Sequence, residues 1–216
     1  MICANESQAS GLFWRGYDRD TILDEIVRNS ELNYALGRQS SGYVYRIETP
    51  KKDRFSLKVA ADKIWNPALL LLAGQHDLLS TLSARLECRV ALVNCVRNPF
   101  DVLATMNRRS SASLENRLRW YRMHCEATQM LIDRDEYPIL TIRHEELVAH
   151  PNRAAASLFQ WLGSSADESV LNAMERVIFR DVRKSRMDVI WPTETVDRVM
   201  ALIDDFPFLH GYNYST

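Results

Sequence analysis

The chain has 216 residues and carries 27 basic and 28 acidic side chains, for a formal net charge of −1. Hydrophobic residues make up 46% and charged residues 25%, which is typical of a soluble globular protein and excludes disordered, collagen-like and disulfide-scaffold chains. A chain of this length buries enough surface to fold without disulfides or structural metals. The balanced charge lacks the basic excess of nucleic-acid-binding proteins, so we expect no nucleic-acid partner.

The four cysteines form no Cys-x-x-Cys pair, which favours reduced thiols in a cytoplasmic protein over a disulfide or zinc framework. The longest apolar stretch covers residues 68–73, far less than a membrane span requires. The N-terminus has no basic region followed by an apolar core, so no signal peptide is indicated. We therefore expect a single cytoplasmic domain over residues 1–216, with no membrane span.

The first part of the chain predicts two helices and two short strands. The helices cover residues 20–29 and 66–86, and the strands cover residues 43–47 and 55–60. Asn66 suits an N-cap and Pro67 suits the first helical turn, whereas Gly74 can interrupt the helix.

The clearest strand covers residues 89–96, because its apolar run is short and rich in valine. Such a run is typical of a strand that is covered on both faces. The elements expected after it are helices over residues 100–109 and 114–134, a strand over 137–142, and helices over 152–162, 167–179 and 193–203. Gly163 suits the end of the helix expected over residues 152–162. Strands that alternate with helices indicate parallel β-α-β units and a layered α/β fold.

The segment after the valine-rich strand carries the most chemical information. Arg97 follows the strand directly, Asn98-Pro99 begins a helix, and Thr105 lies within that helix. Ligands of parallel sheets bind at the carboxyl ends of the strands, where a guanidinium can direct two N–H groups onto a phosphate. The N-terminus of the helix favours the same negative charge. The alternative is that Arg97 pairs with a nearby carboxylate such as Asp101.

Four segments resemble those of sulfotransferases that use 3′-phosphoadenosine 5′-phosphosulfate (PAPS). Residues 97–105, Arg-Asn-Pro-x-Asp-x-x-x-Thr, resemble the family's 3′-phosphate-binding segment. Residues 139–163 resemble its strand–Tyr-Glu-Asp-Leu–Pro–helix–Phe-Leu-Gly segment, and Asp62-Lys63 resembles its mid-chain Asp-Lys element. Arg183-Lys184-Ser185-Arg186, followed by Trp191, resembles its late basic element. The four occur in the family's order, and bacterial sulfotransferases and the tyrosylprotein sulfotransferase branch are most similar.

This resemblance implies a three-layer α/β/α fold around a mainly parallel sheet, of the P-loop nucleotide-binding type. It assigns Arg97 and Thr105 to the 3′-phosphate. It also implies that Arg183, Lys184 and Ser185 close over the nucleotide. It further implies that Lys63 lies near the leaving oxygen and offsets the negative charge that develops there.

A match near the N-terminus assigns a catalytic base. Residues 3–7, Cys-Ala-Asn-Glu-Ser, resemble the Cys-Gly-Glu-Glu-Thr segment of the tyrosylprotein sulfotransferase branch, and Glu6 takes the place of the catalytic glutamate. A carboxylate next to an acceptor hydroxyl can accept its proton during transfer. The alternative is a surface glutamate near the chain terminus.

One element of the family has no counterpart in the sequence. This is the glycine-rich loop Pro-x-Ser-Gly-Thr-Thr, whose backbone N–H groups hold the 5′-phosphosulfate. Because Glu6 matches so close to the start, we expect that loop and the first strand to lie upstream of Met1. The chain as written is then expected to be weakly active or inactive.

The predicted function is the transfer of a sulfuryl group from PAPS, as co-substrate and without a metal, to an acceptor hydroxyl on a small molecule, a glycan or a peptide. Two alternatives are a non-catalytic or degenerate nucleotide-binding domain and another P-loop-type enzyme such as a kinase, although no Walker lysine is visible. A metalloprotease is disfavoured because His144 and His150 are six positions apart rather than four, so we expect a strand-to-helix loop there.

Overall fold

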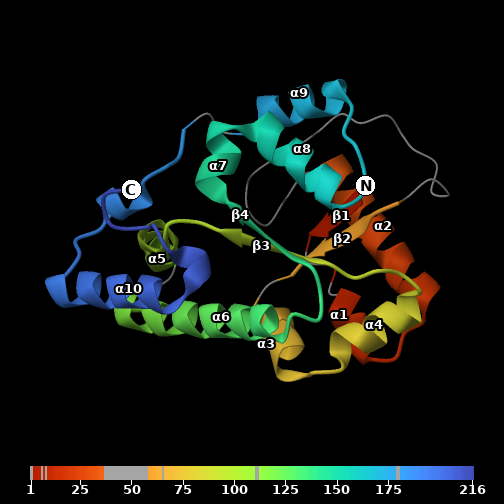
Figure 1. Cartoon of the computed structure of the whole chain (residues 1–216), viewed down its shortest axis with the longest axis horizontal. Helices are drawn as coiled ribbons and strands as arrows, with labels where there is room; N and C mark the ends of the chain where they lie inside the picture. The colour runs from red at the N-terminus through yellow and green to blue at the C-terminus, as the bar shows by residue number, and fades with distance from the viewer. Residues whose placement is uncertain are drawn as a thin grey trace. The chain divides into compact units, whose positions relative to one another are not determined.

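The computed structural model describes residues 2–5, 7, 9–36, 58–64, 66–109, 112–178 and 181–216 (Figure 1). Within these residues the chain combines helices with two short parallel strand pairs. It divides into two compact units: unit 1 is Met1–Val90 with His150–Phe179, and unit 2 is Ala91–Ala149 with Arg180–Thr216. The expectation of a single domain over the whole chain stays a prediction. Among the described helices, none combines the length and the apolar character needed to cross a membrane.

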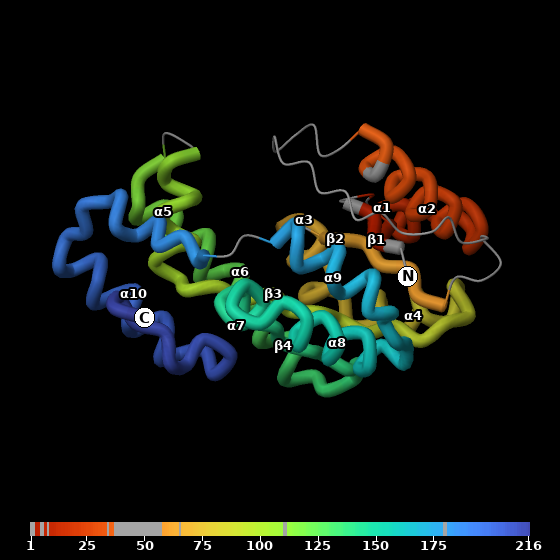
Figure 2. Tube along the Cα trace, turned by 90° about the horizontal axis from the view of Figure 1, so that it is seen from above, coloured from red at the N-terminus to blue at the C-terminus, as the bar shows by residue number. Residues whose placement is uncertain are grey.

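Unit 1 contains one strand pair and six helices in the part of it that the structure describes. In chain order these are β1 (Ile2–Asn5), α1 (Ala9–Trp14), α2 (Arg19–Leu36), β2 (Ala60–Lys63), α3 (Asn66–Gly74), α4 (Leu78–Leu86), α8 (Pro151–Trp161) and α9 (Glu168–Val177). Strands β1 and β2 are parallel, with Ile2 opposite Ala60 and Asn5 opposite Lys63. Helices α1 and α2 pack side by side (Figure 2).

The elements of unit 1 agree with the sequence prediction in part. The helix expected over residues 20–29 is α2, which is longer at its C-terminal end. The helix expected over residues 66–86 is interrupted at Gly74, where α3 ends and after which α4 begins. The strand expected over residues 43–47 lies outside the described residues, and only the last three residues of the one expected over 55–60 are described. Strand β1 and helix α1 were not expected.

Unit 2 contains the other strand pair. Its elements are β3 (Leu92–Val96), α5 (Pro99–Arg108), α6 (Leu114–Arg134), β4 (Ile139–Arg143), α7 (His144–Ala149), the short 3₁₀ helices η2 (Ser185–Asp188) and η3 (Pro207–Leu209), and α10 (Thr193–Asp205). Strands β3 and β4 are parallel, with Leu92 opposite Ile139 and Val96 opposite Arg143. The two helices between them make this a β-α-β crossover, and α10 lies alongside α6 (Figure 1).

Local capping explains where α5 and α6 begin, which is close to the starts that the sequence predicts. The side chain of Asn98 accepts a hydrogen bond from the backbone N–H of Phe100, and Pro99 occupies the first turn of α5. The side chain of Ser113 does the same for α6 by accepting from the backbone N–H of Asn116. Helix α6 has the bounds predicted for it, residues 114–134.

Several described helices are followed by a residue with a left-handed backbone conformation. Gly163, which follows α8, has a φ of 70°, as expected for a glycine that ends a helix. Glu87 after α4 and Asp135 after α6 both have a φ of 50°, although neither is a glycine. These two positions adopt a conformation that most side chains disfavour.

The core of unit 2 joins the end of β3 to three helices and the C-terminal segment. Its members are the buried residues Val96, Phe100, Leu103, Leu118, Cys125, Val199, Leu202, Ile203, Phe206, Leu209 and Tyr212. Strand β3 contributes through Val96, whereas Val93 is 42% exposed and Cys95 is exposed. The prediction that this strand is covered on both faces is therefore wrong, because the core cluster lies on the Val96 side of the strand.

Candidate functional site

The candidate site lies in unit 2, at the carboxyl ends of its two parallel strands. Val96 and Arg143 are paired at the ends of β3 and β4, so Arg97 and His144 follow at the same edge of the sheet. The short loop between β3 and α5 contains Arg97, and the side chain of this arginine is 22% exposed. This edge is where ligands of parallel α/β sheets bind.

The structure brings Arg97 together with two hydroxyl groups from other elements. Its Nη2 donates to the backbone carbonyl of Arg183 and lies 3.4 Å from Oγ of Ser185. Oγ1 of Thr105, on α5, lies 3.3 Å from the same Oγ of Ser185, which is buried. Segments more than 80 positions apart in the sequence therefore meet around one guanidinium.

The Arg97 side chain keeps an unused donor at this place. Its Nε is buried and has no hydrogen-bond partner among the described residues. A buried N–H group without an acceptor is costly, so such groups in native proteins usually have a partner. An anion can accept hydrogen bonds from the guanidinium of Arg97 and from the hydroxyls of Thr105 and Ser185.

Asp101 is the carboxylate that the sequence offered as an alternative partner of Arg97. Nη2 of Arg97 lies 4.0 Å from Oδ2 of Asp101, at the outer limit of an ion pair. The closer partner is Arg186, whose Nη1 donates to Oδ2 at 2.7 Å and whose backbone N–H donates to Oδ1 at 2.9 Å. Asp101 is therefore neutralised mainly by Arg186, which the sequence analysis did not assign to the site.

The other two residues predicted to close over the nucleotide direct their charges away from Arg97. Nη2 of Arg183 lies 3.1 Å from Oδ2 of Asp188, and its side chain is exposed. Nζ of Lys184 is 3.4 Å from the backbone carbonyl of Ser215, and this side chain is exposed too. Of these two residues, Arg183 reaches Arg97 through its backbone carbonyl.

The two predicted catalytic residues belong to the N-terminal part of the chain. Lys63 is exposed at the end of β2, within unit 1. Its neighbour Asp62 accepts hydrogen bonds from the backbone N–H groups of Ser7 at 2.9 Å and Ala9 at 3.1 Å, which fixes the start of α1. Glu6 lies outside the described residues.

Glu145 holds the loop next to the site through hydrogen bonds, a role that its sequence context does not reveal. Its carboxylate accepts from the backbone N–H of Asn98 at 2.9 Å and from the hydroxyl of Tyr212 at 2.6 Å. Burial, followed by this hydrogen bond to the carboxylate, raises the pKa of Tyr212 well above its usual value. Glu145 therefore links the loop that carries Arg97 to the C-terminal segment.

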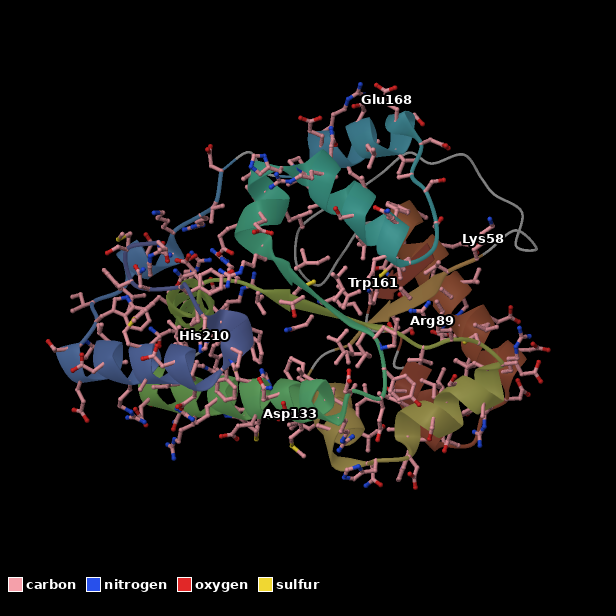
Figure 3. The ribbon with its side chains drawn as sticks, in the orientation of Figure 1. Lys58, Arg89, Asp133, Trp161, Glu168 and His210 are labelled. Atoms are coloured by element: carbon pink, nitrogen blue, oxygen red, sulfur yellow. The ribbon has the colours of Figure 1, made fainter. Side chains whose placement is uncertain are left out.

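The end of β4 is tied to the same C-terminal segment. The guanidinium of Arg143 lies 4.6 Å from the centre of the Tyr212 ring. It also donates a hydrogen bond to the backbone carbonyl of His210, which is labelled in Figure 3. The cation–π contact and the hydrogen bond together hold the strand end in place.

His144, at the start of α7, is next to the Arg97 charge. Burial lowers the pKa of His144, and the positive charge of Arg97 lowers it further, whereas Glu145 and Asp101 raise it. Its Nδ1 is buried without a hydrogen-bond partner among the described residues. The expectation of a loop over these residues is wrong, because His144–Ala149 form a helix.

A second group of arginines lines a small hollow between α6 and α10. Its lining is Leu118, Arg119, Arg122, Arg198 and Ala201, and its volume is about 120 Å³. Arg122 is paired with Asp205 at 2.7 Å, and Arg198 with Glu115. Acidic partners therefore accompany two of the three guanidiniums of this hollow.

The described residues hold no cluster of three or more side chains suited to bind a metal ion. Comparison of the chain with known protein families, curated proteins and solved structures finds no match.

Proposed function

We propose that this chain is a sulfotransferase domain that binds PAPS, with the 3′-phosphate held by Arg97, Thr105 and Ser185. The observation that carries the proposal is the meeting of these three side chains. The resemblance assigns segment 97–105 to the 3′-phosphate and segment 183–185 to the closure over the nucleotide, and the folded chain brings the two segments within hydrogen-bonding distance of each other.

The chemistry of this group of residues fits a phosphate. A guanidinium offers paired N–H donors in the geometry that phosphate oxygens accept, and the two hydroxyls add donors on another side. Asp101 does not oppose the anion strongly, because Arg186 neutralises it.

The proposed reaction moves a sulfuryl group from a phosphate oxygen to an acceptor hydroxyl. The S–O bond to the phosphate breaks, the S–O bond to the acceptor forms, and Glu6 takes the hydroxyl proton. Lys63 offsets the negative charge on the leaving phosphate. The acceptor is a hydroxyl of a small molecule, a glycan or a peptide. The proposal includes a three-layer fold of the P-loop type, which is supported by the two parallel strand pairs.

The binding test compares two nucleotides that differ only in the 3′-phosphate. We expect the wild type to bind adenosine 3′,5′-bisphosphate at least about 100-fold more tightly than adenosine 5′-monophosphate, as charge-assisted hydrogen bonds of this kind allow. Arg97→Ala should abolish most of this preference while the affinity for the monophosphate changes little. Isothermal titration calorimetry measures both affinities.

Arg176→Ala is the matched control, because it removes an exposed arginine from α9 in unit 1. It should leave the preference for the bisphosphate unchanged. A folded wild-type protein that binds both nucleotides equally, or an Arg97→Ala variant that keeps the preference, contradicts the proposal. Turnover with labelled PAPS and a hydroxyl acceptor then separates an enzyme from a binding domain.

A further inference from the structure

Three charged side chains share the interior next to the candidate site. Asp101 is fully buried, Arg186 is 1% exposed, and Arg97 lies at the margin with 22% exposed. Together they carry one negative and two positive charges. A buried carboxylate is unstable without a positive partner. The arginine that pairs with Asp101 therefore determines which of the two guanidiniums keeps an uncompensated positive charge.

Arg186 occupies both oxygens of Asp101. Its Nη1 lies 2.7 Å from Oδ2, and its backbone N–H lies 2.9 Å from Oδ1. The backbone carbonyl of Arg186 accepts a hydrogen bond from Nε1 of Trp191 at 2.9 Å, which fixes this residue from the other side. Arg97, at 4.0 Å from Oδ2, is the second and weaker partner.

We propose that Arg186 is a positioning residue that neutralises Asp101 and thereby keeps the guanidinium of Arg97 available for an anion. Without the Arg186 side chain, Arg97 is the positively charged group that remains within 4.0 Å of Asp101 among the described residues, so Asp101 pairs with Arg97 and the anion loses its cation. This inference rests on the proposed function for the identity of the anion. The exchange of partners within the protein does not depend on any ligand.

The binding experiment uses a second-site rescue. In Arg186→Met, Asp101 retains its charge, and the preference for adenosine 3′,5′-bisphosphate over adenosine 5′-monophosphate should fall at least about tenfold. In the double variant Asp101→Asn/Arg186→Met, residue 101 carries no negative charge that could pair with Arg97. The preference for the bisphosphate should therefore return to within about threefold of the wild type. The amide of the new asparagine can still accept the backbone N–H of residue 186.

Rescue distinguishes this role from a structural one. The double variant loses more native contacts than the single variant, so a purely structural role would make it bind more weakly still. Arg186→Lys, which keeps the positive charge, should retain most of the preference. The inference is overturned if the folded Arg186→Met variant keeps the wild-type preference. It is equally overturned if the double variant folds and binds as weakly as Arg186→Met.

A measurement without ligand tests the exchange of partners directly. Arg97→Gln should lower the melting temperature more in the Arg186→Met background than in the wild type, because Arg97 is then the one charged partner of Asp101 among the described side chains. If Arg97→Gln prevents folding altogether in the Arg186→Met background, and Asp101→Asn restores folding, the inference is supported in the same way. An equal or smaller effect overturns the inference. If the wild type shows no preference for the bisphosphate, the proposed function fails, while this comparison still decides the role of Arg186.

Discussion

Arg97 has two kinds of neighbours, and the balance between them sets its chemistry. Its Nη2 contacts the carbonyl of Arg183 and lies 3.4 Å from the hydroxyl of Ser185, which are neutral partners. The carboxylate of Asp101 is farther away, at 4.0 Å. Neutral neighbours leave the positive charge of a guanidinium uncompensated, so this side chain remains suited to attract an anion.

His144 gives the protein a testable dependence on pH. Its pKa in the folded state is lowered by burial and by Arg97, so the unfolded chain takes up the proton at a higher pH than the folded chain. Stability is therefore lost as pH falls below about 6.5, the ordinary pKa of histidine. His144→Gln should reduce this loss, as measured by melting temperatures between pH 8 and pH 5.

His124 provides the companion variant, because burial lowers its pKa as well. His124→Gln should remove another part of the loss at low pH, and the two substitutions should act together. A His144→Gln protein that melts with the pH dependence of the wild type contradicts the position assigned to this imidazole.

Helix α5 depends on a buried cap at its first turn. Asn98 is 1% exposed; its side-chain oxygen accepts from the N–H of Phe100, and its amide group donates to the carbonyl of Asn213 at 2.9 Å. Asn98→Ala should lower the free energy of unfolding by about 2 kcal/mol, at the upper end for N-caps, because the Asn213 carbonyl also loses one of its two donors and keeps only the Thr216 hydroxyl. Chemical denaturation measures this loss.

The cap of α6 is the internal control for that measurement. Ser113 also accepts a hydrogen bond from the N–H of the third residue along, but it is exposed. Ser113→Ala should therefore cost less than Asn98→Ala, at about 0.5–1 kcal/mol. A loss for Ser113→Ala that equals or exceeds the loss for Asn98→Ala would show that burial of the α5 cap adds nothing.

Sequence reasoning was most accurate where local chemistry sets the structure. The capping residues Asn98 and Ser113 lie within three positions of the groups that they bond, and the helices that they begin were predicted well. The exposed face of β3 was missed because a strand's burial depends on what packs against it. Helix α7 was missed because six residues are too few to show a helical period.

The candidate site itself was only partly readable from the sequence. Arg97 and Thr105 lie on one continuous segment, so both could be singled out there. Ser185 lies 88 positions after Arg97, so only the family resemblance could assign both residues to one site. Arg186 and Glu145 act through partners that are distant in the sequence, and no local pattern marks such pairs.

At the scale of the whole molecule, the four thiols report on the packing of the chain. Cys3, Cys88 and Cys95 are exposed, whereas Cys125 is buried in the core of unit 2. Burial also raises the pKa of Cys125 to about 12, which leaves almost no reactive thiolate at neutral pH. Burial raises the pKa of Cys88 and Cys95 too, so we expect these two thiols of the native protein to react more slowly than Cys3, and Cys125 to react only on unfolding.

Titration with a chromogenic disulfide reagent, before and after the addition of denaturant, counts these thiols. Cys125→Ala should leave the native count unchanged and lower the count after unfolding by one. Four thiols that react at similar rates in the native protein would contradict the packing of α6 against the core.

The left-handed ends of α4 and α6 have a practical consequence for handling this protein. Glu87 and Asp135 each hold a backbone geometry that glycine adopts without strain, in a chain with only seven glycines. Neither residue belongs to the candidate site. Substitution of both residues by glycine should therefore give a more stable protein for crystallisation, and it does not alter the residues around Arg97.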